Sequence, residues 1–532
     1  MAPTPDSADP RRWPLLPILI VAALVTVGLV YWHVIGLPFV QDDWDRLYHY
    51  QSDGLASLLQ TTLSTEHKLF YRPLAELYLR IMYGLFGANP VPFHLVALAI
   101  HGSSAVMVGL IVQKIFRDRL LALLSAVVYG AAIAVHLDSL AWAVGIYDVA
   151  GAFCFLASIR LFIEDRRGAS AAVYVIGCLF KESLILLPVI LLAYDLLIDA
   201  GERAPRPARA RLTEALPFLI GMLAVAAIKL SGESPLHYPA NHPYALQLLG
   251  PHLLTNGLHY LTWMLQSLVP LPIPSVGLAR VLPAVAVLVL LALAARVKGP
   301  AAPSWHRRRV AFLLVWMSIG LVPVIFLPNH VYRYYATYSL AAFVPLALYL
   351  ARETLRTLTV GPVATAILLG SIGVTALFGS SLQAARIYGE GTAPRTFVDG
   401  TNFLIERAAY VEIVRGGLAR LLPRPPRNAA IVLGNVDTWG FDRNRGPRFW
   451  YDDPSLDVYP LAKLRFRGDR LYIADLEVTQ ADAYTGGSRS RIRLDPARTF
   501  FFEVADGVLR PLTDADLARL RASPDRQIPS DP

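Results

Sequence analysis

Residues 14–35 read PLLPILIVAALVTVGLVYWHVI, a run without a charged side chain. At a rise of about 1.5 Å per residue, a helix of this length crosses the hydrocarbon core of a bilayer. The run follows Arg11 and Arg12, exceeds the apolar region of a secretory signal peptide, and has no small-residue cleavage site after it. It therefore predicts an uncleaved first membrane helix with a cytoplasmic N-terminus.

Apolar segments long enough to span a bilayer recur along the rest of the chain. We place them near 93–116, 119–135, 140–163, 170–180, 183–198, 214–231, 250–271, 280–297, 310–327, 332–351 and 361–379. The predicted fold class is an α-helical polytopic membrane protein with about 11–13 transmembrane helices. Residues 1–379 would form this membrane module.

The composition agrees with this fold class. Of the 532 residues, 55% are hydrophobic and 17% are charged, whereas soluble domains have roughly 25% charged residues. The net charge of +9 comes from short basic blocks between apolar stretches, so it does not indicate nucleic-acid binding. Cys154 and Cys178 both lie in apolar stretches and are expected to be core residues, with no disulfide framework.

Basic residues in short loops predict the orientation of the helices. The basic blocks lie at 11–12, 114–119, 166–167, 203–211, 307–309 and 352–356, and all are expected to be cytoplasmic. This leaves three apolar segments between the blocks at 203–211 and 307–309, where parity allows two or four. Because 250–271 contains several polar side chains, we expect it to be re-entrant or to lie along the outer interface.

Two regions are not expected to span the membrane. The first outer loop, 36–92, contains helical patterns at 53–63 and 73–86. The tail, 380–532, predicts a small extracytoplasmic α+β domain. Its expected elements are helices at 396–421 and 513–521 and strands at 431–433, 464–466, 471–476 and 500–504.

Ionisable residues at membrane depth or at span ends are costly, so each is a candidate functional residue. The stretch FVQDDWD, residues 39–45, directly follows the first span. Its adjacent carboxylates, Asp42 and Asp43, could hold a divalent cation such as Mg²⁺ or Mn²⁺. Alternatively, one could act as a base that the other positions. The structural alternative is a solvated loop start in which an aspartate caps a helix.

Three cations fall on the same outer side by parity. Arg72 offers a guanidinium fork to a phosphate, or merely precedes a helix that opens with Pro73. Lys181 either meets a lipid phosphate or is neutralised by Glu182 beside it. Arg333 opens the span near 332–351 among several tyrosines. A carboxylate pair and cations at headgroup depth favour chemistry on a lipid phosphate.

Further polar residues lie within or at the ends of the predicted spans. His94 and His101 are seven residues apart and therefore share a helix face, either as a metal or phosphate site or as hydrogen-bonded helix contacts. His136 and Asp138 lie at the outer end of the third span, and Asp148 lies within the fourth.

Taken in order, these motifs resemble the GT-C class of membrane glycosyltransferases. Within that class they are most similar to the transmembrane O-mannosyltransferase branch that often carries tetratricopeptide repeats, and to its bacterial relatives. The resemblance covers roughly residues 36–350. It rests on Asp42-Asp43, Tyr71-Arg72-Pro73-Leu74, Phe86-Gly87, Phe93-His94-Leu95, His101, His136 and Asp138 with Ala141-Trp142, Asp148, Phe180-Lys181-Glu182-Ser183, Pro188, Asp195, and Tyr332-Arg333-Tyr334 to Ser339.

The sequence also departs from the family pattern. Asp138 stands where the family usually has Glu, and Ile146 stands where it usually has Arg, which puts one phosphate contact in doubt. The tail has no tetratricopeptide repeats, so acceptor recognition is expected to differ.

The resemblance implies an inverting transfer of a hexosyl or pentosyl group. The donor would be a polyprenyl-phosphate sugar, and the acceptor a protein, lipid or glycan on the extracytoplasmic side. Asp42 or Asp43 would deprotonate the acceptor hydroxyl or orient it with the help of a metal. Arg72, Lys181 and Arg333 would stabilise the departing phosphate. The supporting residues would be His94, His101, His136, Asp138, Asp148 and Glu182.

Two other functions compete with this one. A transporter or flippase of a lipid-linked or anionic substrate would also use ionisable residues within spans, but the sequence has no inverted repeat and its polar residues crowd one face. A non-catalytic scaffold would leave the carboxylate pair and the cations unexplained. The composition, rich in Ala, Arg and Pro, favours a bacterial source and hence the inner membrane.

Overall fold

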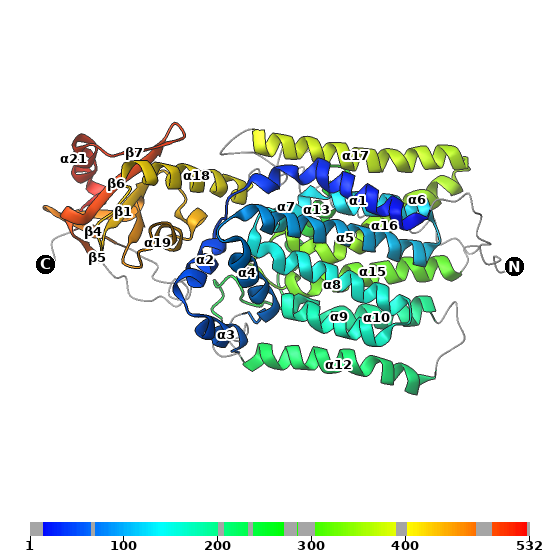
Figure 1. Ribbon diagram of the computed structural model, residues 1–532. Coiled ribbons are helices and arrows are strands. Elements are labelled where there is room, and N and C mark those ends of the chain that lie inside the picture. The colour runs from blue at the N-terminus through cyan, green and yellow to red at the C-terminus, as the bar shows by residue number, and fades with distance from the viewer. Residues whose placement is uncertain are drawn as a thin grey trace.

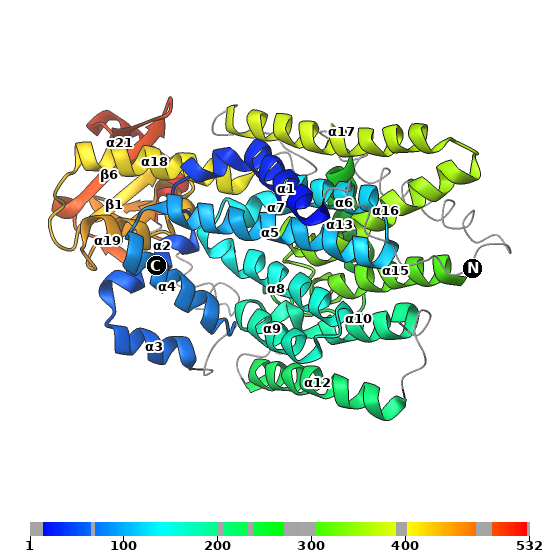
Figure 2. The same cartoon turned by 45° about the vertical axis from the view of Figure 1, so that its right-hand side comes forward.

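The computed structural model describes residues 14–64, 70–199, 207–231, 238–270, 285, 304–389, 402–474 and 492–528. A bundle of long helices joins a smaller α/β region at one end (Figures 1 and 2). We call this end of the bundle the domain end. The predicted segment 280–297, except residue 285, and part of the predicted helix 396–421 lie outside the described residues.

Six helical segments in the described chain are long and apolar enough to cross a membrane. They are Leu15–Gly36, Pro90–Phe116, Ala143–Ile163, Trp305–Ile325, Arg333–Thr357 and Pro362–Tyr388. They contain helices α1 (Leu15–Tyr31), α5 (Pro90–Phe116), α8 (Ile146–Ile163), α15 (Ser304–Ile325), α16 (Thr337–Thr357) and α17 (Pro362–Gly389). The chain is thus a multi-pass membrane protein, as predicted.

The predicted span 119–135 is bent in the structure. Helix α6 (Arg119–Ala131) and helix α7 (Ile133–Leu140) meet at 52°, and together they would count as a seventh span. His136 and Asp138 therefore lie on a short helix of their own. The break places them beside the other elements of the domain end, because α7 packs against the 3₁₀ turn Arg333–Ala336 that begins the α16 segment.

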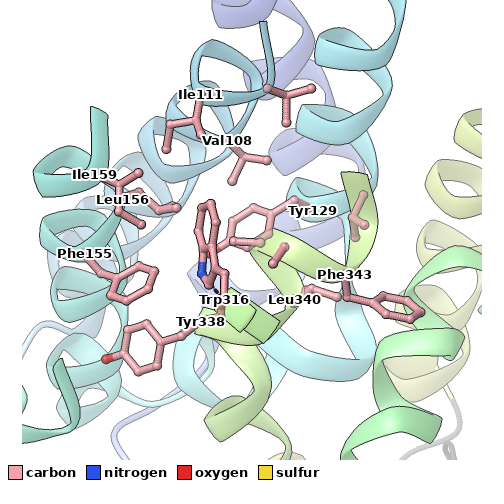
Figure 3. Packing of buried hydrophobic residues seen from close by; sticks show 14 of the residues in the cluster. Val108, Ile111, Tyr129, Phe155, Leu156, Ile159, Trp316, Tyr338, Leu340 and Phe343 are labelled. Atoms are coloured by element: carbon pink, nitrogen blue, oxygen red, sulfur yellow. Dashed lines mark hydrogen bonds between the residues drawn. The ribbon is translucent and has the colours of Figure 1, made fainter. Parts of the chain in front are cut away.

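Shorter apolar helices complete the bundle. They are α9 (Arg167–Phe180), α10 (Leu187–Tyr194) and α12 (Ala208–Ser231), and Figure 1 shows α12 and α17 on opposite edges. The core between the long helices is densely aromatic: Trp316 packs against Phe155, and its indole Nε1 donates to the Tyr338 carbonyl at 3.0 Å (Figure 3). Such packing fixes the helix positions that carry the polar residues.

Helix α13 (His252–Leu268) corresponds to the segment that did not fit the predicted topology. Near its start, the Asn256 amide donates to the carbonyls of Ile325 and Leu327, at the domain end of α15. Just after it, Pro270 accepts a bond from Gln383, toward the end of α17. Both ends of α13 therefore contact the C-terminal parts of α15 and α17, and the re-entrant or interfacial placement of 250–271 stays a prediction.

Basic residues from several predicted cytoplasmic blocks gather at the opposite end of the bundle. Arg352, at the end of α16, pairs with Asp118, between α5 and α6. The Arg309 guanidinium lies 5.5 Å from the centroid of the Phe116 ring. One end of the bundle is therefore basic, and the other carries the first loop and the α/β region.

The first loop folds into three helices at the domain end: α2 (Asp42–Ser52), α3 (Leu55–Leu63) and α4 (Pro73–Phe86). The last two match the predicted patterns at 53–63 and 73–86. Helix α2 was not predicted. Its first turn carries three aspartates, which the positive end of the helix dipole stabilises.

The α/β region, residues 402–474 and 492–528, is called the C-terminal domain below. Helix α18 (Phe403–Leu421) precedes a four-stranded sheet of order β2-β1-β6-β7, built from Asp457–Pro460, Ala430–Gly434, Thr499–Ala505 and Val508–Pro511. β1 runs parallel to both neighbours. Strands β3 (Leu464–Arg467), β4 (Arg470–Ile473) and β5 (Ile492–Leu494) form a second sheet. Helices α19 (Arg445–Tyr451) and α21 (Asp514–Ala522) complete the domain.

Gly145, in the turn before α8, is the tightest glycine position at the domain end. A Cβ atom there would overlap the carbonyl of Ser139. We expect Gly145→Ala to lower the melting temperature of the purified protein by several degrees, because backbone atoms must move. Gly168→Ala, in the first turn of α9 with open space around it, is the matched control and should change it little. Equal melting temperatures for both variants would contradict this packing.

Candidate functional site

The start of α2 is strained and is held by the C-terminal domain. Gln41, the residue before α2, has φ 52° and ψ −126°. Such a conformation costs a non-glycine residue about 1–3 kcal/mol and persists only where the surroundings enforce it. Here the Gln41 amide donates to the Gly440 carbonyl at 2.8 Å. The predicted aspartate pair, Asp42 and Asp43, follows Gln41 directly. The two side chains lie in different surroundings.

Asp43 points into the protein. Its carboxylate accepts backbone hydrogen bonds from Val144 at 2.8 Å, Val40 at 3.0 Å and Ala143 at 3.4 Å. Burial raises the pKa of Asp43 to about 7, although these bonds act to lower it. The side chain ties α2 to the turn before α8, so the structure gives Asp43 a bracing role.

Asp42 points outward and is exposed. Its carboxylate makes no hydrogen bond or ion pair within the described part of the chain. Protein atoms still crowd it enough that burial raises its pKa, while the charges of Arg46, Arg407 and Arg72 lower it. Of the two aspartates, only Asp42 is placed to accept a proton from a bound molecule.

Two of the three predicted cations are held by carboxylates. The Arg72 guanidinium, at the N-terminal end of α4, donates through Nε and Nη2 to Glu182, both at 2.8 Å. The Lys181 ammonium pairs with Asp148 at 3.0 Å and lies 5.4 Å from the centroid of the Tyr335 ring. The adjacent Lys181 and Glu182 thus bond to other residues, and both cations are fixed in place.

A closed series of contacts runs past the start of α2, where Asp42 lies, and we call its members the contact ring. Its residues come from the first loop, the helix bundle, the loop before α13 and the C-terminal domain. In order they are Gly440, Arg407, Phe403, Tyr332, His330, Tyr244, Phe70, Arg72, Tyr147, Glu76 and Arg46.

The ring is closed on both sides of α2. Gly440 accepts the hydrogen bond from Gln41, just before Asp42. Arg46, one turn after Asp42, contacts Glu76 at 3.3 Å. The charges of three ring members, Arg46, Arg407 and Arg72, all lower the pKa of Asp42.

The predicted histidines make structural contacts instead. Both ring nitrogens of His94 lie 3.2 Å from carbonyls, those of Leu140 and Leu37. His101 Nε2 lies 3.0 Å from the Gly130 carbonyl, and the His101 ring lies 4.5 Å from that of His136. These carbonyls lie where helices end or bend, so the histidines satisfy backbone groups that lack a helical partner.

The remaining predicted residues lie beside the bundle's junction with the C-terminal domain. Asp138 accepts a hydrogen bond at 2.9 Å from Asn402, the residue that caps α18. Arg333 is buried at the start of the 3₁₀ turn that packs against α7. Arg333 follows the ring member Tyr332 in the chain but is not itself part of the ring.

Sequence reasoning missed several ring members. Arg46 could have been found, because it lies one helical turn after Asp42. Arg407, Tyr244 and His330 carry no local signal: each sits in an ordinary helix or loop, and only tertiary structure brings it to Asp42.

The pair Asp42 and Asp43 does not fit a divalent cation in this arrangement. Asp43 uses its oxygens on backbone amides and is turned away from Asp42. Within the described ranges, no group of three or more His, Cys, Asp or Glu side chains could hold a metal ion.

Neither a family model nor a curated protein matches the chain. Solved structures similar to it include an oligosaccharyltransferase from Archaeoglobus fulgidus tethered to an acceptor peptide (TM-score 0.44, 11% identity). The similarity spans 85% of this chain and 64% of the oligosaccharyltransferase.

Two further similar structures span different fractions of their proteins. The arabinofuranosyltransferase AftD from Mycobacteria gives a TM-score of 0.40 at 14% identity, over 84% of this chain and 32% of AftD. ArnT from Cupriavidus metallidurans, bound to undecaprenyl phosphate, gives 0.34 at 14% identity, over 84% of this chain and 85% of ArnT. The chain is similar to these three proteins at low sequence identity.

The two aspartates should differ in their effect on stability. Asp43→Ala leaves three backbone amides without an acceptor, at a cost of about 1–3 kcal/mol for each buried donor. We expect Asp43→Ala to lower the melting temperature clearly and Asp42→Ala to leave it unchanged. Thermal unfolding in detergent measures both. An Asp42→Ala variant as unstable as Asp43→Ala would contradict the structural role given to Asp43.

Proposed function

We propose that this chain is a membrane glycosyltransferase that moves a sugar from a polyprenyl-phosphate donor to an acceptor hydroxyl. The observation that carries the proposal is the exposed carboxylate of Asp42, which makes no hydrogen bond or ion pair in the described chain. The contact ring that runs past Asp42 includes Arg72, whose charge acts on the Asp42 carboxylate. A base and a phosphate-binding cation on either side of one space are what glycosyl transfer from a lipid phosphate needs.

The reaction is a single displacement. The acceptor oxygen attacks the anomeric carbon while Asp42 takes the hydroxyl proton. The bond between the anomeric carbon and the phosphate oxygen breaks, and its electron pair leaves with the polyprenyl phosphate. Because attack comes from the face opposite the leaving group, the anomeric configuration inverts.

The departing phosphate gains one negative charge, which a nearby cation stabilises. Arg72 uses Nε and Nη2 on Glu182, so its Nη1 edge is the part we assign to the phosphate. The Lys181 ammonium adds a second positive charge. Glu182 and Asp148 then act as positioning residues, which hold the two cations before the donor arrives.

The distribution of polar groups favours an enzyme over a transporter. Ionised side chains gather at the domain end and at the opposite, basic end of the bundle. Between them, the described helices pack apolar and aromatic residues such as Trp316 and Phe343 (Figure 3). The basic end supports a cytoplasmic placement, which makes the domain end extracytoplasmic and the inner membrane the expected location.

Asp42→Asn should abolish transfer while leaving membrane insertion and the melting temperature intact. Loss of a general base typically costs about 10²–10⁴-fold in rate. The assay incubates the purified protein with radiolabelled polyprenyl-phosphate sugars and measures which one is consumed. Asp53→Asn, at the other end of α2, is the control and should retain activity. Full activity in Asp42→Asn would rule out the proposed base.

The pH profile should report the environment of Asp42. A base works when deprotonated, so kcat/KM should fall as the pH drops through a pKa above the ordinary aspartate value. Arg407 lowers this pKa; Arg407→Gln should therefore move the acidic limb to higher pH. Arg415→Gln, an exposed arginine on the same helix, should leave the limb in place. An unmoved limb in Arg407→Gln would count against Asp42 as the titrating group.

A further inference from the structure

Five consecutive members of the contact ring are aromatic and half-buried: Phe70, Tyr244, His330, Tyr332 and Phe403. We call the first four the aromatic arc. Their ring centroids are separated by 4.8 Å from Phe70 to Tyr244, 4.2 Å from Tyr244 to His330, and 4.6 Å from His330 to Tyr332. Their interplanar angles are 78°, 51° and 71°, so the arc presents both faces and edges of rings that come from three segments far apart in sequence.

The loop that carries Tyr244 is fixed by hydrogen bonds. The Asn329 amide donates to the carbonyls of Ala240 at 2.7 Å and His242 at 3.1 Å. The Tyr244 amide donates to Nδ1 of His242 at 3.1 Å, and the Gln247 amide donates to the Phe326 carbonyl at 3.0 Å. The loop is therefore bound to the segment after α15, which carries His330, and the two rings are presented together.

The arc lies between the phosphate-binding cation and the proposed base. The Arg72 guanidinium stacks on Phe70 at 4.2 Å, which places the cation at one end of the arc. Phe403 and Arg407 follow Tyr332 at the other end and lead back to α2. The charges of Arg72 and Asp42 both affect the pKa of Tyr244, which burial raises.

The arc itself carries no charge. Burial, with the charges of Lys181 and Arg72, lowers the pKa of His330 to about 3, so its imidazole is neutral. A neutral surface with tyrosine hydroxyls and an imidazole at its edges suits a ligand that is apolar on its faces and polar around its rim. A sugar ring has this character, because its C–H groups lie on the faces and its hydroxyls lie around the edge.

We propose that the aromatic arc, with Tyr244 at its centre, binds the sugar ring of the lipid-linked donor. The inference rests on the proposed function. The anomeric carbon has to lie between the leaving phosphate, assigned to Arg72, and the acceptor hydroxyl, assigned to Asp42. Two series of ring members lead from Arg72 to α2: one through Tyr147, Glu76 and Arg46, which is charged, and one through the arc. We assign the sugar ring attached to that carbon to the arc, because the arc is aromatic and uncharged.

The test compares undecaprenyl phosphate with three lipids that differ from it only in carrying a sugar. Binding of tritiated undecaprenyl phosphate is measured, and competition by its glucosyl, mannosyl and arabinosyl esters gives the preference for a sugar-bearing lipid. We expect the wild-type protein to prefer at least one ester by about 3- to 10-fold. Tyr244→Ala should lose this preference yet bind undecaprenyl phosphate unchanged, and Tyr244→Phe should keep most of it.

Tyr238→Ala is the matched control, because Tyr238 lies on the same loop but stacks on His242, outside the ring. It should keep the preference. If Tyr244→Ala unfolds, His330→Asn takes its place. Unchanged preference in a folded Tyr244→Ala variant would overturn the sugar site alone. Failure of the wild-type protein to bind any of these lipids would instead overturn the proposed function.

Discussion

The carboxylate of Asp43 fixes the geometry on which the rest of the site depends. Its three backbone hydrogen bonds join the start of α2 to the turn before α8, inside a protein whose other contacts there are apolar. Buried donors without an acceptor are costly, so this link is strongly specified. With Asp43 turned inward and Gln41 held by Gly440, the neighbouring Asp42 has to face outward. Asp43 therefore positions Asp42.

The contact ring extends this constraint across the domain end. Arg46 and Arg72 come from the first loop, Tyr147 from the bundle, Tyr244 and His330 from the later loops, and Arg407 from the C-terminal domain. Because the Gln41–Gly440 hydrogen bond and Arg407 both belong to that junction, the domain is part of the site and not an appendage beside it. Two paired cations, Arg72 of the ring with Glu182 and Lys181 with Asp148, hold positive charge in place without leaving it uncompensated.

The sequence could predict features that are local or periodic. Long apolar runs predicted the membrane helices, whereas the re-entrant or interfacial placement of 250–271 stays a prediction. The motif at 42–43 led to the site, but the division of roles between Asp42 and Asp43 depends on Val144 and Ala143, about a hundred residues away. Helix α2 was predictable, because its buried face of Trp44, Leu47 and Tyr50 has helical spacing. Arg407 and Tyr244, in contrast, reach the site only through tertiary packing. His94 and His101 drew attention because polar residues are costly in a membrane, and in the structure they bond to backbone carbonyls.

The central claim is that the domain end binds a lipid phosphate next to Asp42. A cryo-EM structure of the protein with undecaprenyl phosphate tests it most directly. The account predicts phosphate density in contact with Arg72, close to Lys181 and on the same side of the ring as the Asp42 carboxylate. Phosphate bound only at the basic end of the bundle, beside residues such as Arg117 and Arg160, would contradict it.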